Sequence, residues 1–275
     1  MVTMVCWNIA WRKAAWRFLL GCGADIALLQ ETSLPPDDVA EQIEASEQIE
    51  VDPAPFHDAD GNRLSRAAIV KLSDRVQVEW LEPVPIAVAR RGDFVESQPG
   101  SIAAAVISAP GVAPFIAASI CAAYDNVHRS VGKSSIVDAS VHRVISDLSL
   151  LIGHIRRHRI VAAGDLTVWH GYGNNDYWKG RNDTVFDRME AIGLPLVGPQ
   201  YPHGRQADPW PTWLPEDSLN VPTYYNIGGS PAMATGQLDY VFASKSMADS
   251  VKVRALNGVE EWGPSDHCRI EIVVT

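Results

Sequence analysis

The sequence has few cysteines, and none of them is arranged as a metal or disulfide motif. Its four cysteines stand at positions 6, 22, 121 and 268, and no two have the short spacing of a zinc-binding pair. Three of them fall in or beside stretches that read as strands. This placement favours buried, reduced thiols and a cytoplasmic protein over a disulfide-linked secreted one.

Long apolar runs are also missing. No stretch reaches the roughly 20 consecutive apolar residues that a membrane-spanning helix requires, so we expect no transmembrane segment. The N-terminus lacks a basic region with a following cleavage site, so we expect no signal peptide. The 275 residues can bury a full core and contain no clear linker. We therefore expect one domain over residues 1–275 and a monomer.

Basic residues are outnumbered by acidic ones. There are 23 lysines and arginines against 33 aspartates and glutamates, which gives a net charge of -10. This balance argues against a protein that coats nucleic acid by bulk electrostatics. It does not exclude a nuclease that uses a divalent metal and a few local cations.

Two alternating stretches near the C-terminus contain an aspartate and a histidine. Leu238 and Tyr240 flank Asp239 in a predicted strand, and His267 begins a second alternating run. An aspartate among apolar neighbours is costly to bury unless something pairs with it. If the two strands lie side by side, Asp239 can hold the ring of His267, with Asp266 next to it. The pattern indicates either a carboxylate-oriented histidine for acid–base or phosphate chemistry, or a buried structural pair.

Three more predicted strands end on polar residues. The apolar stretches Met1–Ile9, Asp25–Glu31 and Ile160–Gly164 deliver Asn8, Glu31 and Asp165 near their carboxyl ends. Each of these residues is either a site residue or an ordinary turn former or exposed strand end.

The remaining pattern alternates strands with helices in two batches. Helices are predicted over residues 11–20, 35–45, 135–155 and 184–192, and further strands over 67–72, 76–80, 102–107 and 115–120. Residues 199–231 read as an ordered loop. This order predicts two sheets packed face to face with helices outside.

Taken together, the polar strand ends form an ordered series of motifs. The motifs are Trp7-Asn8, Leu29-Gln30-Glu31-Thr32, Gly164-Asp165-Leu166-Thr167, Thr223-Tyr224, Gln237-Leu238-Asp239-Tyr240 and Ser265-Asp266-His267. The series resembles the endonuclease/exonuclease/phosphatase family, which contains the DNase I-like nucleases, and covers nearly the whole chain. The resemblance implies a four-layer α/β sandwich, with two packed mixed β-sheets flanked by helices.

The resemblance also implies a metal-dependent hydrolysis. Glu31, helped by Asn8 and Asp266, would bind Mg²⁺ or Mn²⁺, which accept oxygen ligands and retain waters. Asp165 would orient or deprotonate the attacking water. His267, held by Asp239, would contact the scissile phosphate or transfer a proton. The reaction would be in-line hydrolysis of a phosphoester.

The sequence departs from the family pattern at several positions. Thr167 stands where the family usually has Asn, and its hydroxyl has a shorter reach towards a phosphate. Ala10 stands where abasic-site nucleases often carry an acid. For the group that faces the leaving oxygen, Ser119 and Tyr124 are both candidates. His170 is a further candidate from the neighbouring loop, unless it is structural.

Substrate contacts are predicted from charge and aromaticity near these motifs. Arg12, Lys13 and Arg129 are candidates for phosphate contacts, Trp169 for stacking on a base, and Tyr224 for a contact from the Thr-Tyr element. The basic residues can equally form a solvated surface, and the aromatic residues can equally be packing residues.

The leading hypothesis is a nuclease or related phosphodiesterase that acts on a nucleic-acid backbone. An alternative is a phosphodiesterase or phosphatase for a small molecule or lipid headgroup, with Trp210–Leu214 as an exposed apolar loop. A third is a catalytically degenerate binding protein, for which Thr167 is the main support.

Overall fold

Two six-stranded sheets form the centre of the molecule. The computed structural model describes residues 1–45, 66–126, 130, 135–154, 157–171 and 175–275. In spatial order the first sheet contains β15 (Val251–Leu256), β16 (Arg269–Val274), β1 (Val2–Asn8), β2 (Ile26–Gln30), β4 (Ala68–Lys71) and β3 (Glu44–Ala45). The second contains β13 (Leu196–Gly198), β14 (Asp239–Ala243), β12 (Ile160–Asp165), β9 (Val112–Cys121), β8 (Ile102–Ala109) and β5 (Gln77–Leu81). Two short ribbons pair β6 (Val84–Pro85) with β7 (Val95–Glu96) and β10 (Asp125–Asn126) with β11 (Ser135–Ile136).

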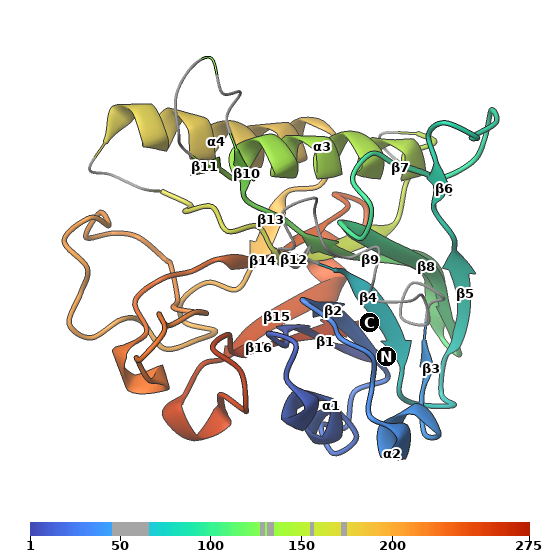
Figure 1. The fold of residues 1–275 in the computed structure, drawn as a ribbon, viewed down its shortest axis with the longest axis horizontal. Helices are drawn as coiled ribbons and strands as arrows, with labels where there is room; N and C mark the ends of the chain where they lie inside the picture. Colours follow the sequence, from blue (N-terminus) through green and yellow to red (C-terminus); the bar gives the residue numbers. More distant parts are fainter. Residues whose placement is uncertain (46–65, 127–129, 131–134, 155–156, 172–174) are drawn as a thin grey trace.

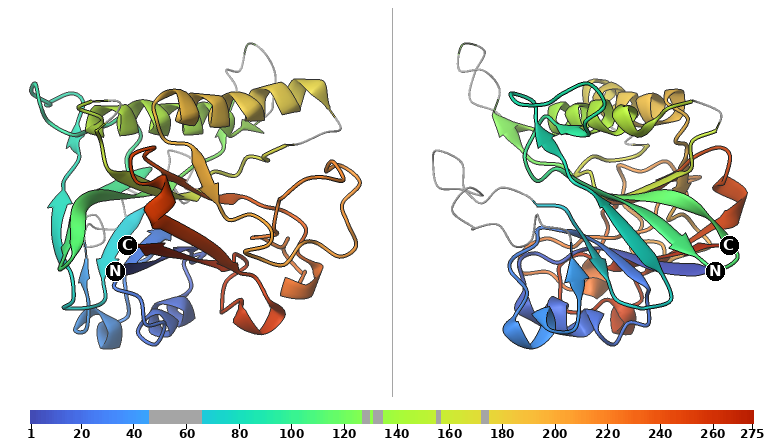
Figure 2. Two further views of the ribbon diagram at one scale, coloured as in Figure 1. Left: turned by 180° about the vertical axis from the view of Figure 1, so that it is seen from behind. Right: turned by 90° about the vertical axis from the view of Figure 1, so that its right-hand side faces the viewer.

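Helices cover the outer faces of both sheets. They are α1 (Lys13–Leu19), α2 (Asp37–Ala40), α3 (Asp138–Leu148) and α4 (Asp176–Ala191), with short 3₁₀ turns at Ser149–Leu151, Pro231–Met233, Ala248–Ser250 and Val259–Glu261. In Figure 1, α3 and α4 lie above the second sheet, and α1 and α2 lie below the first. The two views in Figure 2 show the same order of layers. The expected four-layer α/β sandwich is confirmed.

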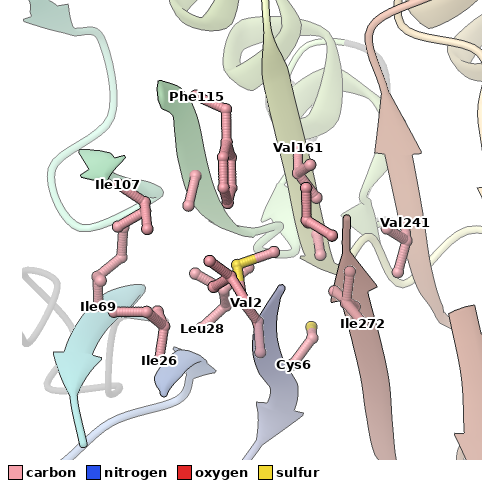
Figure 3. Packing of buried hydrophobic residues seen from close by; sticks show 14 of the residues in the cluster. Val2, Cys6, Ile26, Leu28, Ile69, Ile107, Phe115, Val161, Val241 and Ile272 are labelled. Carbon is pink, nitrogen blue, oxygen red and sulfur yellow. The ribbon is translucent and has the colours of Figure 1, made fainter. Parts of the chain in front are cut away.

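Each central strand is buried on both faces, which explains why the sequence shows continuous apolar runs there. Figure 3 shows the core between the sheets, where Cys6 of β1 packs with residues such as Leu28, Val161 and Ile272. Neighbouring residues of β1 point the other way, and Trp7 packs in the cluster that includes buried residues of α1. All four cysteines are free thiols, and three of them are buried.

The sequence misjudged three elements. The helix expected over 35–45 is only the four-residue α2, because the chain then pairs with β4, where Glu44 forms an ion pair with Lys71 at 2.6 Å. Helix α4 begins eight residues before the predicted start, capped by Asn175, whose side chain accepts hydrogen bonds from Tyr177 and Trp178. Strand β15 was not predicted, although its burial alternates with period two.

The topology gathers several strand ends at one end of the sandwich. Strands β1 and β2 are parallel, as are β9 and β12. In the second sheet, Asp165 at the end of β12 pairs with Asp239 at the start of β14. At the level of the sequence, the contact between Asp239 and His267 was conditional on their strands lying side by side, and this condition is not met. Strand β14 lies in the second sheet and β16 in the first, so any contact between them crosses the sandwich.

Within the described ranges, no helix combines the length and the apolar character needed to cross a bilayer.

Candidate active site

Asp165 is fixed at the end of β12 by three hydrogen bonds. Its Oδ2 accepts from Nδ2 of Asn8 at 3.0 Å, and its Oδ1 accepts from the backbone N and Oγ1 of Thr167 at 2.7 and 3.0 Å. A Cβ on the preceding Gly164 would lie 1.7 Å from the carbonyl oxygen of Ile120, so only glycine fits between these strands. Burial raises the pKa of Asp165 to about 6, although the nearby His267 opposes this effect. The carboxylate is therefore held rigidly and titrates near neutrality.

His267 lies between two carboxylates. Its Nδ1 is 2.8 Å from Oδ2 of Asp239, and its Nε2 is 3.8 Å from Oδ2 of Asp165. Burial disfavours the charged ring, but Asp239, Asp165 and Asp266 outweigh burial and raise the pKa of His267 to about 10. The ring is consequently protonated at neutral pH. Its Nε2 is too far from Asp165 for a hydrogen bond, so that proton remains available.

The segment containing Thr223 and Tyr224 joins the two sheets at this point. The hydroxyl of Thr223 accepts a hydrogen bond from the backbone N of Asp239 at 3.2 Å. Tyr224 forms β-bridges both to Gly236, which precedes β14, and to His267, which precedes β16. This segment explains how a residue of one sheet reaches a residue of the other.

Glu31 follows β2 and lies in the same negative cluster. Burial raises its pKa to about 7, Asp165 and Asp266 add to this effect, and a hydrogen bond from Asn8 and the charge of His267 oppose it. The Asp266 carboxylate lies 4.0 Å from the Arg12 guanidinium. Asp165 and Asp266 both act on Glu31 by charge, so the three carboxylates form one negative cluster, and Arg12 and His267 are cations beside it.

Asn8 presents its amide hydrogens to this cluster. Its Oδ1 accepts a hydrogen bond from the backbone N of Ala10 at 3.0 Å, which turns Nδ2 towards Asp165. The role of Asn8 as a metal ligand stays a prediction, since Oδ1 keeps a second lone pair beside this hydrogen bond. Its geometry is that of a group that orients the neighbouring carboxylates.

Strained backbone is concentrated around the same residues. Within the described chain, the non-glycine residues with positive φ are Ala10, Trp11, Glu31 and Thr167, with φ between 48° and 54°. All four lie within three residues of the end of β1, β2 or β12. Left-handed backbone is unfavourable for a β-branched residue such as Thr167, and strain of this kind occurs preferentially at functional sites. The clustering supports a functional role for this end of the sandwich.

No family model matches the sequence, and no curated protein does. Solved structures do match over the whole chain. An AP endonuclease from Archaeoglobus fulgidus superposes with a TM-score of 0.60 at 14% identity, covering 100% of this chain and 99% of the other. The AP endonuclease LMAP from Leishmania major gives 0.59 at 16% identity, covering 99% and 87%. The 3′ phosphatase NExo from Neisseria, solved with a product DNA hairpin, gives 0.57 at 16% identity, covering 100% of both chains.

The chain has the DNase I-like fold. These neighbours belong to the DNase I-like endonuclease/exonuclease/phosphatase superfamily. It is the same group that the motifs of this chain resemble. At these identities the likeness establishes the fold alone.

Two tyrosines flank the carboxylate cluster in this DNase I-like fold. The ring of Tyr224 lies 4.8 Å from the ring of His267. Burial raises the pKa of Tyr224, and Asp266, Tyr124 and Asp165 contribute to the rise. Tyr124 is 69% exposed, and partial burial and the charge of Asp165 raise its pKa too. Ser119 and Tyr124 were the two candidates for a group near the leaving oxygen, and Tyr124 is accessible.

Ser119 is not available to a substrate, so that prediction is wrong. It is fully buried, its hydroxyl donates to the carbonyl of Leu29 at 2.7 Å, and it accepts from Nε2 of Gln30 at 2.8 Å. Ser119 therefore joins the two sheets through β9 and β2. Adjacent residues of a strand face opposite sides of its sheet. The sequence alone does not show which side of β9 faces the other sheet, so it could not distinguish a buried Ser119 from one that faces a substrate.

His170 lies on the α4 side of the fold rather than in the cluster. Its ring packs against Phe186 at 4.5 Å, and its backbone N donates to the hydroxyl of Tyr240. Burial lowers the pKa of His170, and the other contributions come from Asn220, Asp183 and Lys179. Its predicted contact with substrate is replaced by a packing role.

The other residues predicted to contact substrate lie in different places. Arg12 and Lys13 are exposed beside the cluster, at the start of α1. Trp169 is half-buried and lines a cleft next to Thr167. Arg129 lies outside the described residues. Trp213, which the sequence analysis had placed in a candidate lipid-binding loop, lines this cleft instead. The sequence did not single out Asn182, which also lines it, although Trp178 and Asn182 have the i, i+4 spacing that places two residues on one helix face.

Proposed function

We propose that this protein is a divalent-metal-dependent phosphoester hydrolase that cleaves a nucleic-acid backbone. The observation that carries the proposal is the position of His267 between Asp239 and Asp165, beside Glu31, in a DNase I-like fold. The structural neighbours named as endonucleases and as a 3′ phosphatase support it.

The carboxylate cluster suits a hard divalent cation. Among the residues that the structure describes, no three His, Cys, Asp or Glu side chains form a ready metal cage. Mg²⁺ does not need one, because it retains several waters and is often held by one or two carboxylates. Glu31 and Asp266 are the oxygen donors that fit. Crowding of negative charge around Glu31 supports this assignment, since a cation would relieve it. When bound, Mg²⁺ or Mn²⁺ would neutralise phosphate charge and stabilise the developing charge on the leaving oxygen.

The side chains of this chain provide the remaining parts of an in-line hydrolysis. Asp165, immobilised by Asn8 and Thr167, orients the attacking water and has a pKa suited to accepting its proton. Charged His267 donates its free Nε2 hydrogen to a phosphate oxygen, while Asp239 holds the ring. Tyr124 provides a phenol on the side of Asp165 from which the leaving group can be approached.

A lipid-headgroup enzyme and a catalytically degenerate binding protein are less well supported than a nuclease. Leu214 is buried, and Trp213 packs edge-on against Trp169 at 4.3 Å, so residues 210–214 do not form the exposed apolar loop that a lipid substrate would call for. Thr167 bonds Asp165 through both its backbone N and its hydroxyl. Its presence in place of Asn therefore does not argue for a degenerate site.

A cleavage panel tests the proposal. Supercoiled plasmid, single-stranded DNA, RNA and an abasic duplex are compared with sphingomyelin, an inositol polyphosphate and bis-p-nitrophenyl phosphate, in Mg²⁺, Mn²⁺ or EDTA. We expect metal-dependent cleavage of a polynucleotide that is absent in His267→Ala and retained in Asp187→Ala, a change at an exposed position of α4. Cleavage confined to the lipid or inositol substrates, or equal cleavage by His267→Ala, would refute it.

A further inference from the structure

A cleft of about 350 Å³ opens directly beside the carboxylate cluster. Its lining includes Tyr124, Thr167, Trp169, Trp178, Asn182 and Trp213. Thr167 also bonds Asp165, and the charge of Asp165 acts on the Tyr124 hydroxyl. A group bound in the cleft would therefore be adjacent to a phosphate held at His267.

The aromatic wall of the cleft is held in place by its own packing. The ring of Trp169 contacts Trp213 edge-on, with centroids 4.3 Å apart. Its other side lies against Gly236, where an added Cβ would come within 3.1 Å of the ring. Trp178 is 40% exposed and stands on α4. Rigid aromatic faces of this kind bind planar rings by stacking, at about 1–3 kcal/mol per base.

Asn182 gives the cleft a polar group. It is only 7% exposed and lines the cleft, one helical turn after Trp178. Its side-chain amide carries two N–H donors and one carbonyl acceptor. A ligand with matching donors and acceptors on one edge can therefore form hydrogen bonds with it in the cleft.

The charge of the lining restricts what that ligand can be. Asp138 lines the cleft and is buried, with its carboxylate 2.7 Å from Nη2 of Arg181. The described lining contains no lysine or arginine. A ligand rich in phosphate, such as an inositol polyphosphate, would meet in the described lining a carboxylate whose one cationic neighbour, Arg181, is already paired with it. An acyl chain would offer the amide of Asn182 no hydrogen bond.

We propose that this cleft binds a nucleobase of the substrate next to the scissile phosphate, with Asn182 hydrogen-bonding its edge. A base matches the cleft in being planar and aromatic and in carrying donors and acceptors on one edge. The carboxylate of Asp138 accepts hydrogen bonds and repels carbonyl oxygens. Bases with an exocyclic amino group are therefore favoured over uracil and thymine. This inference rests on the proposed function, because it names the part of a nucleic acid that the same site would recognise.

Calorimetric titration in EDTA tests the cleft without any turnover. Adenosine 5′-monophosphate, uridine 5′-monophosphate and ribose 5-phosphate are titrated into the wild-type protein, Asn182→Ala, Trp178→Ala and Asp187→Ala. We expect adenosine monophosphate to bind at least about tenfold more tightly than ribose 5-phosphate and than uridine monophosphate. Asn182→Ala should weaken adenosine monophosphate about tenfold and leave ribose 5-phosphate unchanged. Trp178→Ala should weaken both nucleotides, and Asp187→Ala neither.

Equal binding of ribose 5-phosphate and adenosine monophosphate to the wild-type protein would overturn the base-binding cleft. Unchanged affinity in a folded Asn182→Ala protein would overturn the role of the amide. Equal affinity for the two nucleotides would overturn the preference for an amino group. Cleavage in the panel without base-dependent binding refutes this inference alone. Base-dependent binding without cleavage refutes the proposed function and leaves the cleft assignment standing.

Discussion

Nδ1 of His267 lies 2.8 Å from Oδ2 of Asp239, although Asp239 begins a strand of one sheet and His267 precedes a strand of the other. The pair therefore forms only when the two sheets are packed. The segment of Thr223 and Tyr224 fixes the distance, because it is hydrogen-bonded to both sides. The geometry of the site is in this way a direct consequence of how the sandwich closes.

Replacing the Asp239 charge should weaken the site while keeping its shape. In Asp239→Asn an amide oxygen can still accept from His267, but the largest charge that raises the pKa of His267 is gone. We expect that pKa to fall, and turnover to drop about 10²-fold or more, because the charged form of the ring would be less favoured at neutral pH. Imidazole NMR in metal-free buffer measures the first effect, and steady-state assays the second. An unchanged His267 pKa would contradict the assignment.

The sequence could predict the polar strand ends because their strands are buried on both faces. Apolar runs that end at Asn8, Glu31 and Asp165 are visible without a structure, and their order along the chain indicated the fold. It could not predict which sheet each strand joins, and so could not show that the contact between Asp239 and His267 crosses from one sheet to the other. That assignment depends on pairing between residues far apart in the chain, which local pattern does not encode.

The aromatic cleft was beyond sequence reasoning for a similar reason. Its walls come from the loop after β12, from α4 and from the long segment before β14, which meet only in the folded chain. The start of α4 was missed because Gly180 interrupts an otherwise helical stretch and suggested a loop. The signal that could have placed the start of α4 is Asn175, a favourable N-cap residue five positions before Gly180.

The hydroxyl of Thr167 can be tested with a matched pair of substitutions. Thr167→Val keeps the shape but removes the hydrogen bond from Oγ1 to Asp165, whereas Thr167→Ser keeps it. A hydrogen bond to a charged group contributes about 1.5–3 kcal/mol. We therefore expect Val to lower turnover at least about tenfold and Ser to have little effect. Equal turnover by the two variants would show that the backbone N–H of Thr167 and the amide of Asn8 position Asp165 without the hydroxyl.

Stability should depend on pH through Glu96, which lies away from the site. Burial raises the pKa of Glu96 to about 7, against hydrogen bonds from backbone N–H groups such as that of Ile102. An acid whose pKa is higher in the folded state stabilises the fold at low pH, and this stability is lost as pH rises from about 4.5 to about 7. Glu96→Gln should therefore gain stability over the wild type on the order of 2 kcal/mol at pH 8 and almost none at pH 4.5. Urea unfolding at several pH values measures the difference, and a constant difference would refute it.

Metal binding should be visible in thermal stability before any substrate is known. At a metal concentration 100 times Kd, binding stabilises the folded state by about 2.7 kcal/mol, which for a chain of this size raises Tm by several degrees. We expect Mg²⁺ to raise the Tm of the wild type and not that of Glu31→Gln. In EDTA, Glu31→Gln should be at least as stable as the wild type, because it relieves the crowding with Asp165 and Asp266. A full Mg²⁺ response in this variant would remove Glu31 from the proposed metal site.

Two glycines should respond in opposite directions to the same substitution. At Gly164 an added Cβ would meet the carbonyl oxygen of Ile120 at 1.7 Å, so Gly164→Ala must push β9 and β12 apart beside Asp165. We expect a loss of more than about 3 kcal/mol in the free energy of unfolding, or failure to fold. At Gly180, in the interior of α4, nothing lies within 4 Å of the added Cβ. Gly180→Ala should therefore gain up to about 1 kcal/mol from helix propensity. Chemical denaturation of both variants makes the comparison, and a Gly164→Ala protein as stable as the wild type would contradict the close approach of the two strands.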